Sequence, residues 1–387
     1  MKIVRSLACS LTLAALALAG CVVSPAEEEG ESEPVAEESS AATASPIWVT
    51  AYYAAWQRAR LPASKIDMDA LTHVVHFNVV PRPDGTLAPE STGITVEASR
   101  ELVEAAHAKN KKALITIGGA GAREPFVSAM RAATRTEFVW NIVRLVQSRK
   151  YDGVDLDLEP MKASDRADFV AFVRQLRQAI RMTNPKLLIT AAVVHQPAIF
   201  DEVESELDQI NIMTYDLSGA WQGFDTWHNA SLYSGTRFAS GAKAPSVHDT
   251  VAEWQSAGIA RKKLGLGIGF FGYVWKGATG PRQNIAGVST KTITYRDLMA
   301  RYYRPERYRW DDVASAPFLT IDEPGRESDL FISFDDGRLA GMKVDYAKAT
   351  AMGGVIVWEL GGGYEDGRPE RERDRMLKTI RFRAFGR

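Results

Sequence analysis

Short apolar segments rich in β-branched residues alternate with longer amphipathic segments from residue 46 onward. Strands that alternate with helices favour parallel pairing through right-handed crossovers. Eight such repeats predict an α/β fold of the closed (β/α)8 TIM-barrel type, with an open doubly wound sheet as the alternative. The eight predicted strands cover residues 47–53, 71–80, 112–119, 153–159, 187–194, 210–216, 264–271 and 354–360.

Amphipathic helices separate these strands. Thr134 and Glu137 have the spacing of a capping box, which predicts that a helix begins at this point. Another helix is predicted over 338–352, before the last strand. Apolar residues between the fourth and fifth strands recur at helical intervals; they are Phe169, Phe172, Val173, Leu176 and Ile180.

The chain is longer than a plain barrel of about 250 residues requires. Most of the surplus lies at 276–336, which contains its own strand-like pieces (KTITY and DLFISF) and a helical piece (YRDLMARYY). We expect this segment to form a small α+β insertion between strand seven and its helix, and to wall one side of a cleft. A second long loop, 217–250, follows strand six.

The fourth strand carries the candidate chemistry. Successive side chains of a strand point to opposite faces, so Asp155, Asp157 and Glu159 share one face while the intervening apolar residues share the other. The acidic face is expected to point into the barrel, with Glu159 at the C-terminal end where barrel enzymes place their active sites. Three neighbouring inward carboxyls cannot all ionise cheaply, which favours a general acid that stays protonated near neutral pH.

Other interpretations of the polar motifs are weaker. The three acids spread along one strand instead of converging, which disfavours a Mg²⁺ or Ca²⁺ site. The Gly267-x-Gly269-x-x-Gly272 pattern follows a strand but opens no helix, so a dinucleotide site is not expected. His73 and His76 should face opposite sides of a strand and are interpreted as structural. We therefore expect neither a metal nor another cofactor.

The strand-four pattern D-G-x-D-x-D-x-E, from Asp152 to Glu159, resembles the signature of glycoside hydrolase family 18, the chitinases and their relatives. The resemblance runs through most of 46–362. The further segments that carry it are Ala51-Tyr52-Tyr53-Ala54-Ala55-Trp56, Ile117-Gly118-Gly119, Met213-Thr214-Tyr215-Asp216, His228-Asn229-Ala230-Ser231-Leu232-Tyr233, Phe334-Asp335-Asp336 and Val357-Trp358-Glu359-Leu360.

This resemblance implies catalytic roles for four residues. Glu159 would protonate the glycosidic oxygen, and Asp157 would hold the substrate's acetamido group with Asp155 as its buried proton-sharing partner. Tyr215 would hydrogen-bond the same group, whose oxygen would attack C1 in a retaining, substrate-assisted hydrolysis. Trp358 would form the floor under the sugar. The remaining implied substrate contacts are Tyr52, Phe77, Gly118, Gly119, Met213 and Asp216.

The chain departs from the family pattern at several places. Family members often have Trp where this chain has Ala120 and Leu158, Tyr where it has Pro160, and Arg where it has Tyr273. These differences leave substrate length and specificity open.

Tryptophan placement supports sugar binding independently, because aromatic rings stack on the apolar faces of sugars. Three of the nine Trp, Trp48, Trp140 and Trp254, are assigned to the core. Five others lie at or just after the C-terminal ends of predicted strands and are expected to contact sugar: Trp56, Trp221, Trp227, Trp275 and Trp358.

The N-terminus predicts export. Residues 1–20 combine a short basic start with an apolar stretch too short for a permanent bilayer span. They end before Cys21 in Leu-Ala-Gly-Cys, which resembles a bacterial lipobox, so Cys21 is the expected lipidation site. The only other cysteine, Cys9, would leave with the signal. Residues 22–45 carry seven Glu and no Lys or Arg, and they predict a disordered acidic linker.

Charge and composition narrow the partners. The formal net charge is -1, and 46–387 is only mildly basic, so no nucleic-acid surface is indicated. We expect an exported bacterial lipoprotein of the cell envelope, monomeric, that contacts the membrane through its lipid anchor alone. The expected partner is an oligosaccharide or polysaccharide that contains N-acetylglucosamine.

Several functions remain open from sequence. The leading one is cleavage of chitin-like β-linked N-acetylglucosamine. The same mechanism could instead act on peptidoglycan glycan strands or on the chitobiose core of N-glycans. A glycan-binding lectin on the same barrel is an alternative of another class, although such lectins typically lose the acid at the position of Glu159.

Overall fold

The computed structural model describes residues 47–386. The predicted signal peptide (1–20), the lipidation site Cys21 and the acidic linker (22–45) therefore lie outside the described residues. Within the described part, no helix is both long and apolar enough to cross a membrane.

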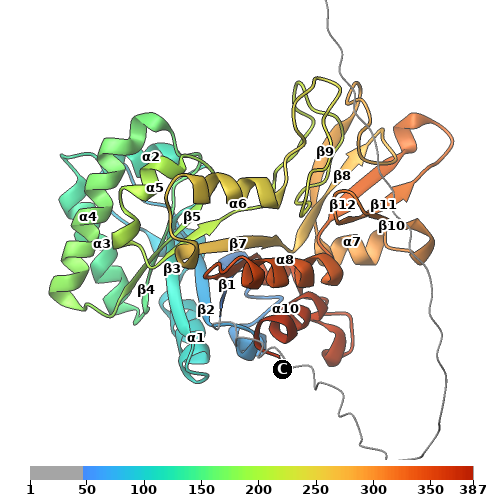
Figure 1. Ribbon diagram of the computed structural model, residues 1–387. Coiled ribbons are helices and arrows are strands. Elements are labelled where there is room, and N and C mark those ends of the chain that lie inside the picture. The colour runs from blue at the N-terminus through green and yellow to red at the C-terminus, as the bar shows by residue number, and fades with distance from the viewer. Residues whose placement is uncertain (1–46, 387) are drawn as a thin grey trace, which may run out of the picture. The chain divides into compact units, whose positions relative to one another are not determined.

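Eight parallel strands close into a barrel in the order β1-β13-β7-β6-β5-β4-β3-β2 (Figure 1). Each contains or overlaps one of the eight predicted segments, so the closed TIM barrel is confirmed and the open sheet is wrong. The strands are β1 (Trp48–Ala54), β2 (His73–Val79), β3 (Lys112–Gly118), β4 (Gly153–Asp157), β5 (Leu188–Val193), β6 (Gln209–Ile212), β7 (Leu264–Gly269) and β13 (Gly354–Trp358).

Helices surround this barrel, and α4 follows the predicted apolar periodicity. The capping box predicted at the start of α3 is wrong. Thr134 does precede the helix, but its backbone is not extended as in a usual N-cap (φ -115°, ψ -18°). Its hydroxyl donates to the carbonyl of Ser128 at 2.8 Å and forms no capping hydrogen bond with the helix. The helices are α1 (Val96–His107), α2 (Arg123–Ala129), α3 (Arg135–Ser148), α4 (Arg166–Thr183), α5 (Pro197–Asp201), α6 (Val247–Ser256), α8 (Gly337–Ala349), α9 (Leu360–Gly363) and α10 (Arg375–Phe385).

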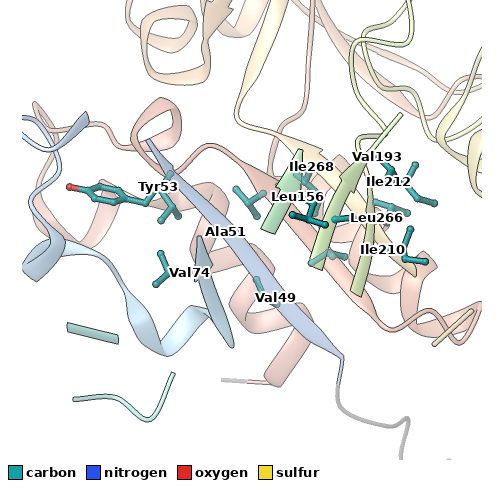
Figure 2. Packing of buried hydrophobic residues seen from close by; sticks show 14 of the residues in the cluster. Val49, Ala51, Tyr53, Val74, Leu156, Val193, Ile210, Ile212, Leu266 and Ile268 are labelled. Carbon is teal, nitrogen blue, oxygen red and sulfur yellow. The ribbon is translucent and has the colours of Figure 1, made fainter. Parts of the chain in front are cut away.

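The alternation along each strand sorts residues between two layers. Outward side chains join one large apolar cluster with the helices, and a smaller apolar cluster lies inside the barrel. Figure 2 shows part of the outer cluster, including Val49, Ala51, Tyr53, Leu156 and Ile268. The inner cluster contains Tyr52, Val75, Phe77, Leu114, Ala192 and Ile356.

The glycine pattern on β7 has a packing explanation. A Cβ on Gly267 would lie 2.9 Å from the ring of Tyr215 and 2.7 Å from the backbone nitrogen of Thr214. A bare backbone at this position therefore lets the Tyr215 ring sit against the strand. After Gly269 the chain continues into the strand Phe271–Lys276 and not into a helix, so the strand-turn-helix context of a dinucleotide site is missing.

The predicted insertion is an antiparallel sheet of order β10-β11-β12-β8-β9 beside the barrel (orange in Figure 1). It begins at Phe271, not at residue 276, because the apolar run 264–271 passes from β7 into β8 without a polar break. Its elements are β8 (Phe271–Lys276), β9 (Ser289–Thr294), α7 (Tyr295–Arg301), β10 (Tyr308–Asp311), β11 (Ala316–Ile321) and β12 (Leu330–Phe334).

Two aspartates join the end of the insertion to the barrel. Asp335 forms a fully buried ion pair with Lys343 of α8 at 2.5 Å and accepts from the backbone of Gly269 at 3.3 Å. Asp336 caps α8 by accepting from the backbone nitrogen of Leu339 at 2.8 Å. The chain therefore leaves the insertion at a defined point next to the end of β7.

Candidate active site

The acidic face of β4 points into the barrel, as predicted. Asp155 and Asp157 are buried, and Glu159 lies just beyond the strand, where it is partly exposed. The intervening Leu156 and Leu158 belong to the outer apolar cluster. One short strand thus carries three carboxyls from the barrel interior to its C-terminal mouth.

Asp155 is held by hydroxyls from three other strands, the two neighbours β3 and β5 and the more distant β1. Tyr52 and Thr116 donate to its Oδ2 at 3.1 Å each, and Thr190 donates to Oδ1 at 2.6 Å. Burial raises the pKa of Asp155 to about 6, although the three hydrogen bonds pull it down. Asp155 is therefore a carboxyl group held in a fixed position by three hydrogen bonds at the base of the site.

Asp157 is held much more loosely. Its Oδ1 is buried and has no hydrogen-bond partner among residues 47–386. Burial raises its pKa first, and repulsion from Glu159 and Asp155 raises it further. A buried acceptor without a donor is costly, so this oxygen is suited to receive a hydrogen bond from a ligand.

Glu159 has the properties of a general acid. Burial raises its pKa, and the negative charge of Asp216 adds to that rise. A raised pKa keeps the carboxyl protonated at higher pH than an ordinary glutamate, which is what proton donation near neutral pH requires.

Tyr215 and Asp216 face this acid from the end of β6. The hydroxyl of Tyr215 is buried and lacks a partner within the described part of the chain. Asp216 adopts a left-handed conformation (φ 55°), and its N–H donates to Oδ1 of Asn229 at 2.9 Å. Burial raises the pKa of Asp216, while a hydrogen bond from Tyr273 lowers it.

An aromatic group forms the neighbouring wall. The ring of Trp358, at the end of β13, lies 4.6 Å from that of Phe77 and 5.6 Å from that of Tyr52. Trp56 packs edge-on against Phe77 at 5.9 Å and is 61% exposed. Met213 packs against the same inner cluster. These rings present apolar surface at the mouth of the barrel.

Two cavities meet at Asp216, which lines both. The acid arm, of about 300 Å³, is lined by Ala120, Gly121, Glu159, Pro160, Val194, His195, Met213, Tyr215 and Asp216. The tryptophan arm, of about 460 Å³, is lined by Trp56, Gln57, Asp216, Phe270, Phe271, Lys291, Thr292, Ile293, Thr294, Asp297, Arg301, Tyr302, Trp358 and Glu359. Residues of β9 and α7 line the tryptophan arm, so the insertion forms one wall of this cavity, as predicted.

Two of the five tryptophans expected to contact sugar are core residues instead. Trp275 is fully buried against Phe331 in the insertion's own apolar cluster. Trp227 is also fully buried, and its Nε1 donates to the carbonyl of Pro245 at 2.8 Å. Trp221 is 49% exposed but lines neither arm. The sequence indicated that these rings lie near the barrel mouth. It could not show that the insertion buries Trp275 in its own core.

Gly118 and Gly119 shape the site without lining either arm. Both have positive φ, and a Cβ on Gly118 would overlap the carbonyl oxygen of Asp157 at 1.9 Å. The N–H of Gly119 donates to the same oxygen at 2.8 Å. The glycines therefore let the end of β3 approach the backbone that carries Asp157.

Three residues of the site could be given no individual role from the sequence. Asn229 holds the backbone of Asp216, and Tyr273 bonds the carboxyl of Asp216, where the family often has an arginine. Glu359 is buried and accepts from Nε2 of Gln57 at 2.8 Å. Only the tertiary structure brings these distant segments together, so no local signal could have assigned them. Among residues 47–386, no group of three or more His, Cys, Asp or Glu is arranged to hold a metal ion.

Asn229→Ala should lower kcat about tenfold with little change in KM, because the N–H of Asp216 loses its partner and its conformation is no longer held. Steady-state kinetics on a soluble oligosaccharide would measure this split. Ser218→Ala is the matched control, since Ser218 donates to the carbonyls of Trp227 and His228 in the same loop without touching Asp216. Equal losses in both variants would show that the loop matters only for folding.

Comparison with known proteins agrees with this geometry. Chitinase A1 of Niallia circulans is 30% identical over 289 residues, which cover 65% of this chain and 41% of that protein. The chain spans less than half the length of the first curated relatives that it matches.

Solved structures share the fold at lower identity. The Group IV chitinase of Ostrinia furnacalis in complex with allosamidin superimposes with a TM-score of 0.74 at 21% identity, over 86% of this chain and 97% of that one. Human YKL-39, described as a pseudo-chitinase with retained chitooligosaccharide binding, gives 0.74 at 17% identity, over 88% of this chain and 100% of that one. The family model for glycosyl hydrolases family 18 matches residues 49–363, and the chain therefore belongs to that family.

Proposed function

We propose that this protein is a glycoside hydrolase that cleaves β-1,4-linked N-acetylglucosamine polymers or oligomers, with Glu159 as the general acid. The observation that carries the proposal is the position of Glu159, which ends the inward acidic face after β4, lines a cleft and is partly buried, so that its pKa is raised. Two buried polar atoms without partners in the described chain, Oδ1 of Asp157 and the hydroxyl of Tyr215, support it. Relatives named as chitinases point to the same substrate class.

The two unpartnered atoms match the two ends of an acetamido group. Oδ1 of Asp157 can accept a hydrogen bond from the N–H, and the Tyr215 hydroxyl can donate one to the carbonyl oxygen. That oxygen then attacks C1 while Glu159 protonates the leaving oxygen, which forms an oxazolinium ion. Glu159, now ionised, activates the water that opens this ion, so configuration is retained.

The aromatic wall would bind the reacting sugar. Trp358 offers a broad ring beside Asp216 in the tryptophan arm, and Phe77 and Tyr52 support it from behind. A sugar stacked on Trp358 would have its substituents directed toward the carboxyls of β4, because both end at the same mouth of the barrel.

A lectin without activity is the competing function, as the fold similarity to YKL-39 illustrates. The presence of Glu159 with a raised pKa favours hydrolysis. Product analysis on chitin oligomers, peptidoglycan and a high-mannose glycopeptide in parallel tests the proposal. We expect new reducing ends from at least one N-acetylglucosamine-containing substrate, with retained anomeric configuration. Binding without any cleavage would support the lectin instead.

The alkaline limb of the pH–rate profile should depend on Asp216. Glu159 must be protonated to act, so activity is lost as pH rises through its pKa. The charge of Asp216 helps to raise that pKa, so Asp216→Asn should move the limb by about one unit to lower pH. The measurement is kcat/KM against pH. Asp297→Asn, in the same arm, is the control, and an unmoved limb in Asp216→Asn would contradict this coupling.

The N-terminal sequence supports a cellular location. We propose that residues 1–20 are removed on export and that Cys21 is acylated, so that the acidic segment 22–45 tethers the barrel to a membrane of the cell envelope. Intact-mass measurement of protein purified from membranes should give a chain that starts at Cys21 and carries acyl chains. Cys21→Ser should leave unprocessed or soluble protein. An unmodified Cys21 in the mature protein would end this proposal.

A further inference from the structure

We propose that the tryptophan arm binds a carboxylate carried by the substrate, so that the preferred glycan is acidic. Among glycans rich in N-acetylglucosamine, this chemistry belongs to peptidoglycan strands freed of their stem peptides, in which alternate sugars bear a lactyl ether carboxylate. The inference rests on the proposed function and narrows its substrate class.

The observation is a pair of unneutralised cations in the cavity wall. Lys291 of β9 and Arg301 of α7 both line the tryptophan arm, and both are exposed. Within residues 47–386, neither side chain forms a salt bridge with any of the acidic groups. Both cations come from the insertion, which is the part of the chain that builds this wall.

The acidic residues of the same arm are already engaged. Asp297 lies one helical turn before Arg301, yet its carboxyl accepts from the hydroxyl of Thr294 at 2.8 Å and lies 3.9 Å from Arg296. Glu359 accepts from Gln57 at 2.8 Å and from the backbone of Gly361 at 2.9 Å. The engaged carboxyls leave the ammonium and the guanidinium available to an external anion.

The one remaining acid of this arm, Asp216, and the strand register place the cations relative to the reacting sugar. Asp216 lines this arm but bonds Tyr273, whose register partner on β9 is Thr292, the neighbour of Lys291. Trp358 lines the same cavity. A glycan that passes from the floor of Trp358 along the insertion wall would therefore meet Lys291 and Arg301 with its next sugars.

Neutral chitin carries no anionic group that could form an ion pair with these cations. A carboxylate would form charge-assisted hydrogen bonds with both the ammonium and the guanidinium, which are stronger than bonds between neutral groups. Because both cations are exposed, each contact should change affinity only a few-fold, and salt should weaken it.

Binding to the Glu159→Gln protein separates recognition from turnover. We would measure dissociation constants by calorimetry for two tetrasaccharides, neutral tetra-N-acetylchitotetraose and a peptide-free alternating strand of N-acetylglucosamine and N-acetylmuramic acid. Adding Lys291→Gln and Arg301→Gln together should raise the dissociation constant of the acidic ligand about tenfold and that of the neutral ligand less than about twofold. Raising the salt concentration from about 50 to about 500 mM should weaken binding of the acidic ligand only, and only in the protein that retains both cations.

Lys276→Gln is the matched control, because Lys276 is an exposed lysine of the adjacent strand β8 that does not line the arm. It should change neither affinity. The inference would be overturned if the double variant lost affinity for both ligands equally, or lost none for the acidic ligand. Lys291 would then be an ordinary lysine of a sheet edge.

Turnover by the enzyme with Glu159 intact tests the proposed function separately. Failure to cleave either tetrasaccharide would refute the hydrolase proposal even if the acidic ligand binds selectively. Cleavage of both with no dependence on Lys291 and Arg301 would refute only the charge recognition.

Discussion

Glu159→Gln is expected to lower kcat at least about a hundredfold, the scale at which loss of a general acid usually shows. The amide has nearly the same shape, so the fold and the affinity for oligosaccharides should persist. Because Glu159 lines the acid arm and is the outermost of the three carboxyls of β4, no other group of that strand can take over the proton transfer. Stopped assays on an N-acetylglucosamine oligomer would measure the loss.

The leaving group provides an internal control for this variant. A nitrophenyl glycoside departs with little need for a proton, so Glu159→Gln should reduce its kcat/KM much less than that of the natural oligomer. Thermal unfolding should give closely similar midpoints for both proteins. If the variant kept more than about a tenth of wild-type turnover on the oligomer, Glu159 would not be the sole acid.

Asp157→Asn is expected to lower kcat about a hundredfold or more, because a carboxylate beside a developing cation is among the strongest stabilising groups in a dry site. The proposed nucleophile is the substrate's own acetamido oxygen, so a fully deacetylated oligomer should not be cleaved. A stable thiazoline analogue should inhibit competitively. Initial rates of the wild type and of Asp157→Asn with acetylated and deacetylated oligomers of equal length, with and without the analogue, would measure these three effects.

Asp155→Asn is the matched control for this second prediction. Asp155 lies deeper on the same strand face and is held by Tyr52, Thr116 and Thr190. Oδ1 of Asp157 has no partner in the described part of the chain and can receive one from substrate, so loss of the Asp155 carboxylate should lower kcat clearly less. Two results would contradict the mechanism. One is cleavage of a deacetylated oligomer at a comparable rate, and the other is a covalent glycosyl ester trapped on Asp157.

The local pattern of the sequence was sufficient for the barrel and for its acidic strand. All eight strands were predictable because each is a short apolar run, and because alternation along a strand is a local property. The same rule placed Asp155, Asp157 and Glu159 on one inward face, and it separated His73, which faces inward near Gln209, from His76, which bonds Tyr151 on the outer side. Local geometry determines these features, so no distant contact was needed to predict them.

Boundaries and burial at the insertion were less predictable. The predicted seventh strand ended at residue 271 and the predicted insertion began at residue 276, so β8 (Phe271–Lys276) was not predicted as a strand, because no polar residue marks its start after β7. Trp275 has the sequence context of a rim residue, yet it fills the core of a sheet whose other strands, such as the one with Phe331, come from later in the chain. Burial depends on which segments meet, and sequence spacing does not contain that information.

The sequence by itself determined the barrel, the order of carboxyls along β4 and the identity of the candidate acid, because these follow from periodicity and strand polarity within single segments. Only the tertiary structure decided how far the pKa of Glu159 is raised and which residues surround this acid. Asp216 raises the pKa of Glu159 from the loop after β6, Asn229 holds Asp216 from further along the chain, and Lys291 lines the cleft from the insertion. Such effects arise from charges and hydrogen bonds between segments far apart in the chain, which meet only when the barrel closes.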